Sequence, residues 1–211
     1  MKTILTVDFD IFMKDSIESY NHMIEKPWKD RFNTIPFLNQ LPFDGISYQK
    51  VLKYLLFLFS KTDNKNKVVF LIEHHHILNF LDNDEEYHIV NIDHHHDWCY
   101  TPEDFAHAIT KVNCGNWVKY LNDTGHLASY TWIKNPSSQV PLEEQSFGQY
   151  NLRDCTLENF STFDEIYIVL SPDYVPPYYH SLFFLILDMA NTIFETHFEL
   201  QQIDSSCSEK D

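Results

Sequence analysis

Two shortages in the sequence exclude whole classes of function. Only four of the 211 residues are glycine, which leaves no glycine-rich loop to surround a phosphate and argues against kinases, GTPases and Rossmann-type dehydrogenases. Lysine and arginine total 15 against 31 aspartates and glutamates, so the formal charge is −16. Such a charge repels nucleic acid phosphate and favours a cationic partner.

Long apolar runs and paired cysteine motifs are also absent. The longest apolar runs, within residues 51–59 and 181–187, are shorter than the roughly 20 residues of a membrane-spanning helix. The N-terminal segment lacks the pattern of a signal peptide. We therefore expect a cytoplasmic protein with no membrane partner. The four cysteines show no CxxC spacing, and we interpret them as reduced thiols.

The apolar pattern predicts an α/β fold. Short, β-rich apolar runs predict strands at residues 3–9, 68–72, 88–92, 129–133 and 165–170. Helical spacing is found at residues 48–60, 102–112, 116–121 and 179–200. Continuously apolar strands that alternate with helices favour a mostly parallel sheet with helices on both faces, a three-layer sandwich.

The chain shows no convincing linker, so we expect one domain over residues 1–203 and a flexible tail over 204–211. The polar segment 135–160 has few periodic apolar positions, which indicates a surface loop or an insertion. It is a candidate for shaping the mouth of a substrate site.

Acidic and histidine residues directly follow three of the predicted strands. They are Asp8 and Asp10, then Glu73, His74, His75 and His76, then Asp93, His94, His95, His96 and Asp97. In open α/β sheets, ligands bind beyond the carboxyl ends of the strands. A lone Asp-x-Asp or histidine triplet is common on protein surfaces, so the hypothesis of a metal site depends on all three clusters together.

Spacing suggests which of these side chains converge. In an extended backbone, Asp8 and Asp10 point to one side, as do Asp93, His95 and Asp97. One histidine of the second cluster, His75 or alternatively His74, would complete a set of six ligands. Carboxylates with imidazoles suit divalent ions such as Mn²⁺, and six ligands can hold two ions that activate a shared water molecule.

The segment from Asp93 to Asp97 resembles the Asp-x-His-x-Asp signature of the ureohydrolase superfamily, which includes arginase and agmatinase. The closer similarity is to the arginase-like family of bacterial peptide arginases: Glu-His-His with an apolar pair in residues 73–78, Asn-Trp at 116–117 and Gly-His at 125–126. Residues 6–10 are similar to the Ser-x-Asp-x-Asp motif. In arginases that motif follows the others, so the resemblance implies either a circular permutation or different roles for Asp8 and Asp10.

The resemblance implies an arginase-like metallohydrolase with two Mn²⁺ ions. Its activity would be hydrolysis of arginine side chains in a ribosomally made precursor peptide to ornithine and urea, a modification used in natural-product biosynthesis. His126, or else His96, would give a proton to the departing amine. Asp173 or Glu73 would bind the guanidinium, with Glu73 among the catalytic groups.

Other roles stay open for several of these residues. Asn116 would bind substrate or cap a helix, and Trp117 is more typical of the core than of a substrate contact. Asp173 would otherwise shape a turn beside Pro172, and His126 would otherwise belong to a loop after Gly125.

Two other functions compete with this one. Residues 91–95 also resemble the Asp-His-His motif of dinuclear manganese phosphoesterases. The His-x-x-x-Asp-x-Asp opening of those enzymes is missing, and lysine and arginine are scarce around all three clusters. The third hypothesis is a non-catalytic metal-binding protein on the same scaffold. The sequence predicts neither the oligomeric state nor the native metal.

Overall fold

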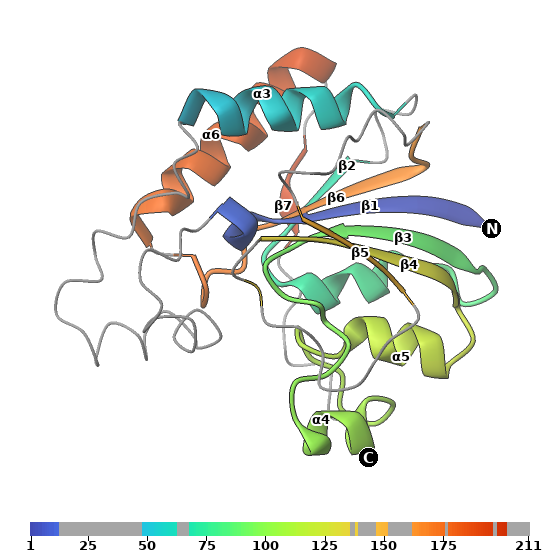
Figure 1. Cartoon of the computed structure of the whole chain (residues 1–211). Coiled ribbons are helices and arrows are strands. Elements are labelled where there is room, and N and C mark those ends of the chain that lie inside the picture. The colour runs from blue at the N-terminus through green and yellow to red at the C-terminus, as the bar shows by residue number, and fades with distance from the viewer. Residues whose placement is uncertain are drawn as a thin grey trace, which may run out of the picture.

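The structure, a computed structural model, describes residues 1–12, 48–62, 68–135, 138, 147–151, 162–175, 177–195 and 198–201. Within these residues the fold is α/β, built on one seven-stranded sheet (Figure 1). The strands are β1 (Lys2–Asp8), β2 (Val68–Leu71), β3 (Tyr87–Ile92), β4 (Leu127–Lys134), β5 (Gly148–Asn151), β6 (Glu165–Val169) and β7 (Leu200–Gln201). Their order across the sheet is β5-β4-β3-β1-β6-β2-β7, and every neighbouring pair is parallel.

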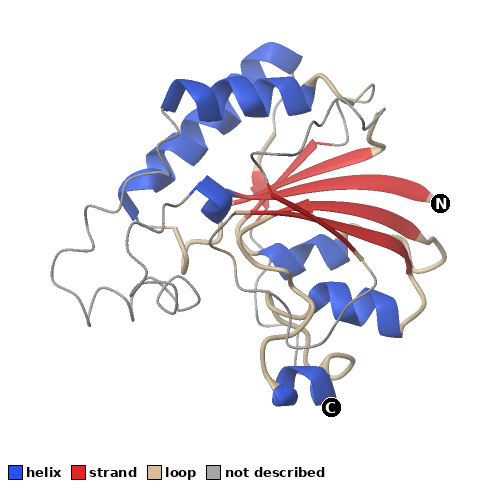
Figure 2. Cartoon of the chain, viewed as in Figure 1, coloured by secondary structure: helices blue, strands red, loops and turns tan. Residues whose placement is uncertain are grey.

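Helices cover both faces of the sheet, which confirms the expected layering. Helices α3 (Tyr48–Phe59) and α6 (Pro177–Phe194) lie on one face. The other face carries α4 (Pro102–His107), α5 (Trp117–Asp123) and the short 3-10 helix η5 (His74–Asn79) (Figures 1 and 2). A second 3-10 helix, η1 (Phe9–Phe12), follows β1 directly.

The two layers of core explain why the strands are apolar on both sides. In β1, Leu5 and Val7 belong to the apolar cluster under α3 and α6, whereas Ile4 belongs to the cluster that includes Trp117 of α5. All four side chains have no exposed surface. Burial of each such apolar side chain contributes about 1.5–3 kcal/mol, which favours apolar residues on both faces of the central strands.

The edges of the sheet differ from the expectation. Strand β5 lies in the polar segment 135–160, for which the sequence predicts a surface loop or an insertion, and the two-residue β7 follows the end of α6. Both are short edge strands, and pairing on one side only leaves their sequences free of a strong apolar pattern. Two helices are also shorter than predicted: α4 ends at His107 and α6 ends at Phe194, before Glu195 in the left-handed region (φ 51°).

The parallel pairing brings the carboxyl ends of the central strands to one edge of the sheet. Val7 of β1 is paired with Ile92 of β3 and with Ile168 of β6, and Leu71 of β2 is paired with Val169 of β6. The residues that follow these four strands therefore meet, although they are distant in sequence. Because the chain passes from β1 to β2 and then back to β3 on the other side of β1, this edge is also where ligands bind in such folds.

Candidate metal centre

Three carboxylates surround one nitrogen of His74, at the start of η5. His74 Nδ1 lies 2.9 Å from Asp93 Oδ2, 3.1 Å from Asp97 Oδ2 and 3.3 Å from Asp8 Oδ2. Nδ1 is buried and makes no hydrogen bond of acceptable geometry to any described residue. A buried polar atom without a hydrogen bond is costly, and a lone nitrogen facing several carboxylate oxygens is the arrangement that a cation would complete.

The other nitrogen of the same ring fixes its orientation. His74 Nε2 lies 2.6 Å from the hydroxyl of Thr6, two residues before Asp8 in β1, and the ring packs against Trp117 with centroids 4.8 Å apart. Metal-binding histidines are commonly held through the nitrogen that does not bind the metal. The contact with Thr6 therefore presents Nδ1 to the carboxylates.

A second group of ligand atoms lies beside the first. His95 Nδ1 is 2.7 Å from Asp10 Oδ2 and 3.7 Å from Asp93 Oδ1. Asp10 Oδ2 is buried and makes no hydrogen bond of acceptable geometry to any described residue. Ligand atoms of these three residues all lie within 4.8 Å of one another, as do those of Asp8, His74 and Asp93.

Asp93 belongs to both groups. Its Oδ2 faces His74 and its Oδ1 faces His95. A carboxylate with its two oxygens in two different ligand sets can bridge two ions, which lie about 3.5–4 Å apart in two-metal sites. The described residues could therefore hold one ion in each group.

Hydrogen bonds from surrounding residues hold the aspartates on the β3 side. The indole nitrogen of Trp117 donates to Asp97 Oδ2 over 2.6 Å, and the side-chain amide of Asn91 donates to Asp93 Oδ2 over 3.2 Å. The backbone N–H of His95 donates to Asp93 Oδ1 over 2.8 Å. These bonds set the orientation of the carboxylates before any ligand arrives.

The two aspartates after β1 are held in a similar way. The N–H of Asp10 donates to Asp8 Oδ1 over 3.2 Å, and the N–H of His94 donates to Asp10 Oδ1 over 3.3 Å. The hydroxyl of Ser171, just beyond β6, donates to Asp8 Oδ2. Ser171 and Asp97 both adopt left-handed backbone conformations, with φ of 48° and 52°, a strain of the kind that concentrates at functional sites.

The convergence comes from turns rather than from extended strands. Asp10 lies in η1, and the segment from Asp93 to Asp97 lies beyond the end of β3. The period-two spacing therefore predicts the right side chains through the wrong backbone geometry.

The four carboxylates are nearly inaccessible to water. Asp8, Asp10, Asp93 and Asp97 are at most 3% exposed, and no described lysine or arginine forms an ion pair with them. Burial, with the charge of Asp93, raises the pKa of Asp97 to about 7. Burial, with the charge of Asp8, raises the pKa of Asp10 well above its usual value.

Burial and the neighbouring charges also shift the pKa values of His74 and Asp93. Burial alone lowers the pKa of His74, but the carboxylates, Asp97 foremost, raise it well above the usual value for histidine. Burial raises the pKa of Asp93, yet His74 and His95 outweigh it and hold that pKa well below its usual range. The cluster therefore carries protons where a metal ion would otherwise neutralise the carboxylates.

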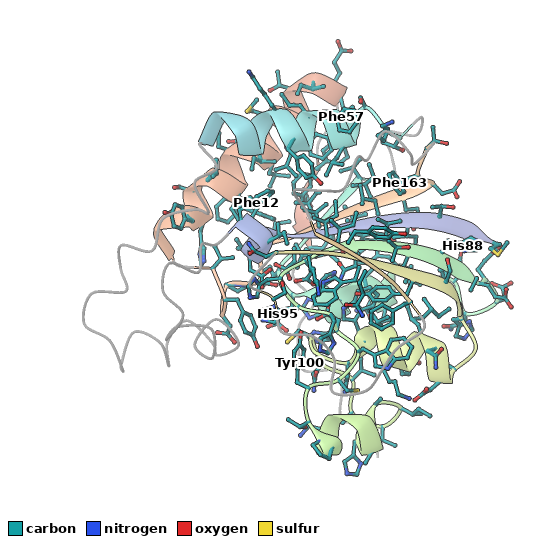
Figure 3. The ribbon with its side chains drawn as sticks, in the orientation of Figure 1. Phe12, Phe57, His88, His95, Tyr100 and Phe163 are labelled. Carbon is teal, nitrogen blue, oxygen red and sulfur yellow. The ribbon has the colours of Figure 1, made fainter. Side chains whose placement is uncertain are left out.

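A cavity of about 290 Å³ opens onto this cluster. Its lining consists of Asp8, His74, His95, Asp97, Tyr100, Asn113, Cys114, Gly115, Ser171 and Tyr174. The ring of Tyr174 lies 4.6 Å and that of Tyr100 lies 5.9 Å from the ring of His95, measured between centroids. Figure 3 shows His95 and Tyr100 close together near the carboxyl ends of the strands. The cavity is thus acidic and aromatic.

The structure brings together six of the residues proposed as metal ligands: Asp8, Asp10, His74, Asp93, His95 and Asp97. It does not bring His75 to them. His75 Nδ1 lies instead 3.4 Å from Glu73 Oε2, in a separate group that includes His76. In η5 the side chains of successive residues point in different directions, so only His74 faces the carboxylates, and the preference for His75 is corrected.

His126 lies at the wrong end of the sheet for the role of proton donor. Its carbonyl accepts from the N–H of Tyr87, the first residue of β3, and its Nδ1 contacts the carbonyl of Glu85. His88, next to Tyr87, is at the far end of the strands from His95 (Figure 3). Six residues of extended β3 separate the two ends by about 20 Å. The assignment to His126 is therefore corrected.

His96, the alternative proton donor, contacts other residues and does not face the cavity. Its ring stacks on Tyr100 with centroids 4.1 Å apart, and its Nδ1 accepts from the N–H of Trp98. It is 1% exposed and does not line the cavity. We interpret it as a support for Tyr100.

The expected substrate-binding residues lie outside the cavity. Asp173 is exposed, and it is the next residue, Tyr174, that lines the cavity. The side chain of Asn116 is fully buried; it accepts from the N–H of Asn113 and donates to the carbonyl of Lys111. Asn116 therefore shapes the loop that forms one wall of the cavity. Glu73 does not line the cavity either.

Sequence reasoning missed three supporting residues. Trp117 was expected in the core, where it is, but it also donates to Asp97. Thr6 and Asp8 are two residues apart in β1, so their side chains point to the same face of the sheet. The period-two spacing that indicates Asp8 therefore indicates Thr6 as well. Tyr174 is in the turn after β6, next to Asp173, whose proline neighbour predicts that turn.

Comparison of the chain with protein-family models, with curated proteins and with solved structures finds no match. Any assignment of function therefore depends on the chemistry of the site itself.

Proposed function

We propose that this chain is a metal-dependent hydrolase that acts on the guanidinium group of arginine in a peptide. The observation that carries the proposal is the position of Asp93, whose two carboxylate oxygens face two different sets of ligands. Such a bridging carboxylate is typical of two-metal hydrolases.

The residues fit two divalent ions in number, charge and chemistry. The first ion would be held by Asp8, His74, Asp93 and Asp97, and the second by Asp10, Asp93 and His95. Four carboxylates carry −4, which two dications balance, and a mixture of carboxylates and imidazoles suits Mn²⁺. Bound ions of this kind lower the pKa of water and so supply a nucleophile at neutral pH.

The cavity favours a flat cation as substrate. None of the described residues that line it is lysine or arginine, while two tyrosine rings flank His95. Cations are attracted to aromatic faces by about 0.5–2 kcal/mol. Burial raises the pKa of Tyr174, so its hydroxyl stays protonated at neutral pH and can donate a hydrogen bond.

Size and charge support an arginine side chain carried by a larger molecule. The cavity, about 290 Å³, is at the small end of ligand pockets, which start at about 300 Å³. It suits one side chain rather than a whole peptide. The net charge of −16 would speed the encounter with a basic peptide.

The proposed reaction adds water to the guanidinium carbon. The bond between that carbon, Cζ, and Nε of the side chain breaks. Cζ keeps the oxygen of the water and leaves as urea, and Nε takes a proton from the water and becomes the side-chain amine of ornithine. The chain's own residues would hold the guanidinium beside His95, against the nearby rings of Tyr100 and Tyr174. A phosphodiester is disfavoured because no described lysine or arginine lines the cavity to hold its phosphate oxygens.

Mass spectrometry tests the proposal. An arginine-containing peptide, free arginine and a phosphodiester are incubated separately with Mn²⁺-loaded protein. We expect the peptide to lose about 42 Da per modified arginine, the mass of the CN₂H₂ unit removed in this hydrolysis. The Asp93→Asn variant should be inactive, and the Asp173→Asn variant, altered outside the cavity, should stay active.

The other outcomes would replace the proposal. Turnover of free arginine alone would contradict a peptide substrate. Cleavage of the phosphodiester alone would assign the protein to the other metalloenzyme class. No turnover of any of the three by metal-loaded protein would favour a non-catalytic metal-binding protein.

A further inference from the structure

A second, separate group of possible metal ligands lies at the start of η5. One ligand atom from each of Glu73, His75 and His76 lies within 4.8 Å of the other two. None of the three lines the acidic cavity, and His74, between Glu73 and His75 in sequence, faces the other way into the main cluster.

The carboxylate of Glu73 is not used by the helix. Glu73 occupies the N-cap position of η5 with extended backbone (φ −123°, ψ 146°), yet its side chain makes no capping hydrogen bond. Its Oε2 lies instead 3.4 Å from His75 Nδ1, and its side chain is 47% exposed. The carboxylate therefore faces an imidazole and is within reach of an ion from solvent.

The two imidazoles also have nitrogens that lack hydrogen bonds. Nδ1 of His75 and Nδ1 of His76 are both buried, and neither forms a hydrogen bond with any described residue. The two rings lie close, with centroids 4.6 Å apart and planes inclined by 52°. Buried nitrogens are normally satisfied, so these two point to a ligand that accepts their lone pairs.

We propose that Glu73, His75 and His76 form a third metal site, selective for borderline ions such as Zn²⁺ or Co²⁺ rather than for Mn²⁺. Two imidazoles and one carboxylate are a donor set typical of zinc, which takes three protein ligands and a water molecule. Bonds of about 2.0–2.1 Å in a tetrahedron place two ligand atoms about 3.4 Å apart. The separation of Glu73 Oε2 and His75 Nδ1 is 3.4 Å.

The main cluster and the η5 group should bind different metal ions, because their ligand atoms differ. The main cluster is rich in carboxylates, with four of them for two imidazoles, whereas the η5 group has one carboxylate for two imidazoles. Hard ions prefer the first kind of site and borderline ions the second. With the main cluster saturated by Mn²⁺, added Zn²⁺ should therefore bind at η5.

The test is a metal count on the full-length protein. Protein saturated with Mn²⁺ is titrated with Zn²⁺ by calorimetry, and both metals are counted after gel filtration. The double variant His75→Ala/His76→Ala removes two ligands that are partly exposed, and Glu73→Gln removes the third. His107→Ala, at an exposed histidine in α4, is the matched control. Replacing Zn²⁺ by Co²⁺ reports geometry through visible absorption.

We expect the wild type and His107→Ala to bind one zinc ion per chain more than the double variant, with the manganese count unchanged in all proteins. The unchanged manganese count also shows that the variants fold. Glu73→Gln should bind zinc more weakly, and the cobalt spectrum of the wild type should be tetrahedral. An equal zinc count in wild type and double variant would overturn the proposal, as would zinc uptake matched by loss of manganese. Neither result depends on catalytic activity, so the site can fail while the proposed function stands.

Discussion

Replacement of Trp117 by phenylalanine tests whether the residues around the metal centre set its affinity. Trp117 is fully buried, and its indole N–H donates to Asp97 Oδ2 over 2.6 Å. Phenylalanine fills most of the same space but cannot donate. Loss of an outer hydrogen bond of this kind commonly weakens metal binding 10–100-fold, which is about 1.4–2.7 kcal/mol.

The effect can be read as metal-dependent stability. At a free Mn²⁺ concentration of about 100 times the wild-type Kd, binding stabilises the wild type by about 2.7 kcal/mol and a variant with 10–100-fold weaker binding by about 0.4–1.4 kcal/mol. In a chain of this size, 1 kcal/mol changes Tm by about 2–4 °C. The ion that Asp97 helps to hold should therefore contribute about 5–11 °C to the gain in Tm of the wild type and about 1–6 °C to that of Trp117→Phe, while the second ion adds the same amount to both.

Trp132→Phe provides the matched control. Trp132 is equally buried, and its indole donates to the backbone carbonyl of Asp93 rather than to a carboxylate. Both variants should lose stability without metal, because each loses a buried hydrogen bond. Only Trp117→Phe should lose much of the gain in Tm on adding Mn²⁺. Equal gains in the two variants, measured by differential scanning fluorimetry and calorimetry, would refute the role of Trp117 in orienting Asp97.

Three further predictions follow from the same geometry. Asp10→Asn removes a ligand of the second group only, so the variant should bind one Mn²⁺ where the wild type binds two; retention of both ions would exclude Asp10 as a ligand. Because the pKa of Asp97 is raised to about 7 and that of His74 is also raised, the metal-free site holds protons that Mn²⁺ must displace. Affinity should therefore fall as the pH drops below about 7, by up to tenfold per pH unit for each proton released, and calorimetry in buffers of different ionisation enthalpy should detect that release. His126→Ala alters the opposite end of the sheet, so Mn²⁺ affinity and turnover should change by no more than about twofold; a loss of turnover with metal binding intact would restore His126 as the proton donor.

The central part of the fold was predictable because it is buried on both sides. The apolar runs that became β1, β2, β3 and β6 are buried along most of their length, and β4 is buried over part of its length, which favours a parallel sheet covered on both faces. Strand β5, in contrast, is polar and pairs on one side only, so its sequence resembles that of a loop. The end of α4 at His107 could not be predicted from the sequence either, because the helical spacing of apolar residues continues beyond it.

The metal cluster was predictable in composition but not in detail. Aspartates and histidines after strands indicate a site because parallel strands end at one edge. The choice of His74 over His75 depends on the turn of a 3-10 helix, and the roles of Trp117 and Tyr174 depend on tertiary contacts. Neither kind of information is contained in residue spacing. His126 shows the opposite error, since a motif suggested a role that the position of β4 does not allow.

The most direct test of the account is electron paramagnetic resonance of the protein titrated with Mn²⁺. If Asp93 bridges two ions, the wild type should bind two Mn²⁺ per chain with the spectrum of a magnetically coupled pair, and Asp93→Asn should lose that coupled signal. A single ion per chain, or two ions with the spectra of isolated Mn²⁺, would contradict a shared dinuclear centre.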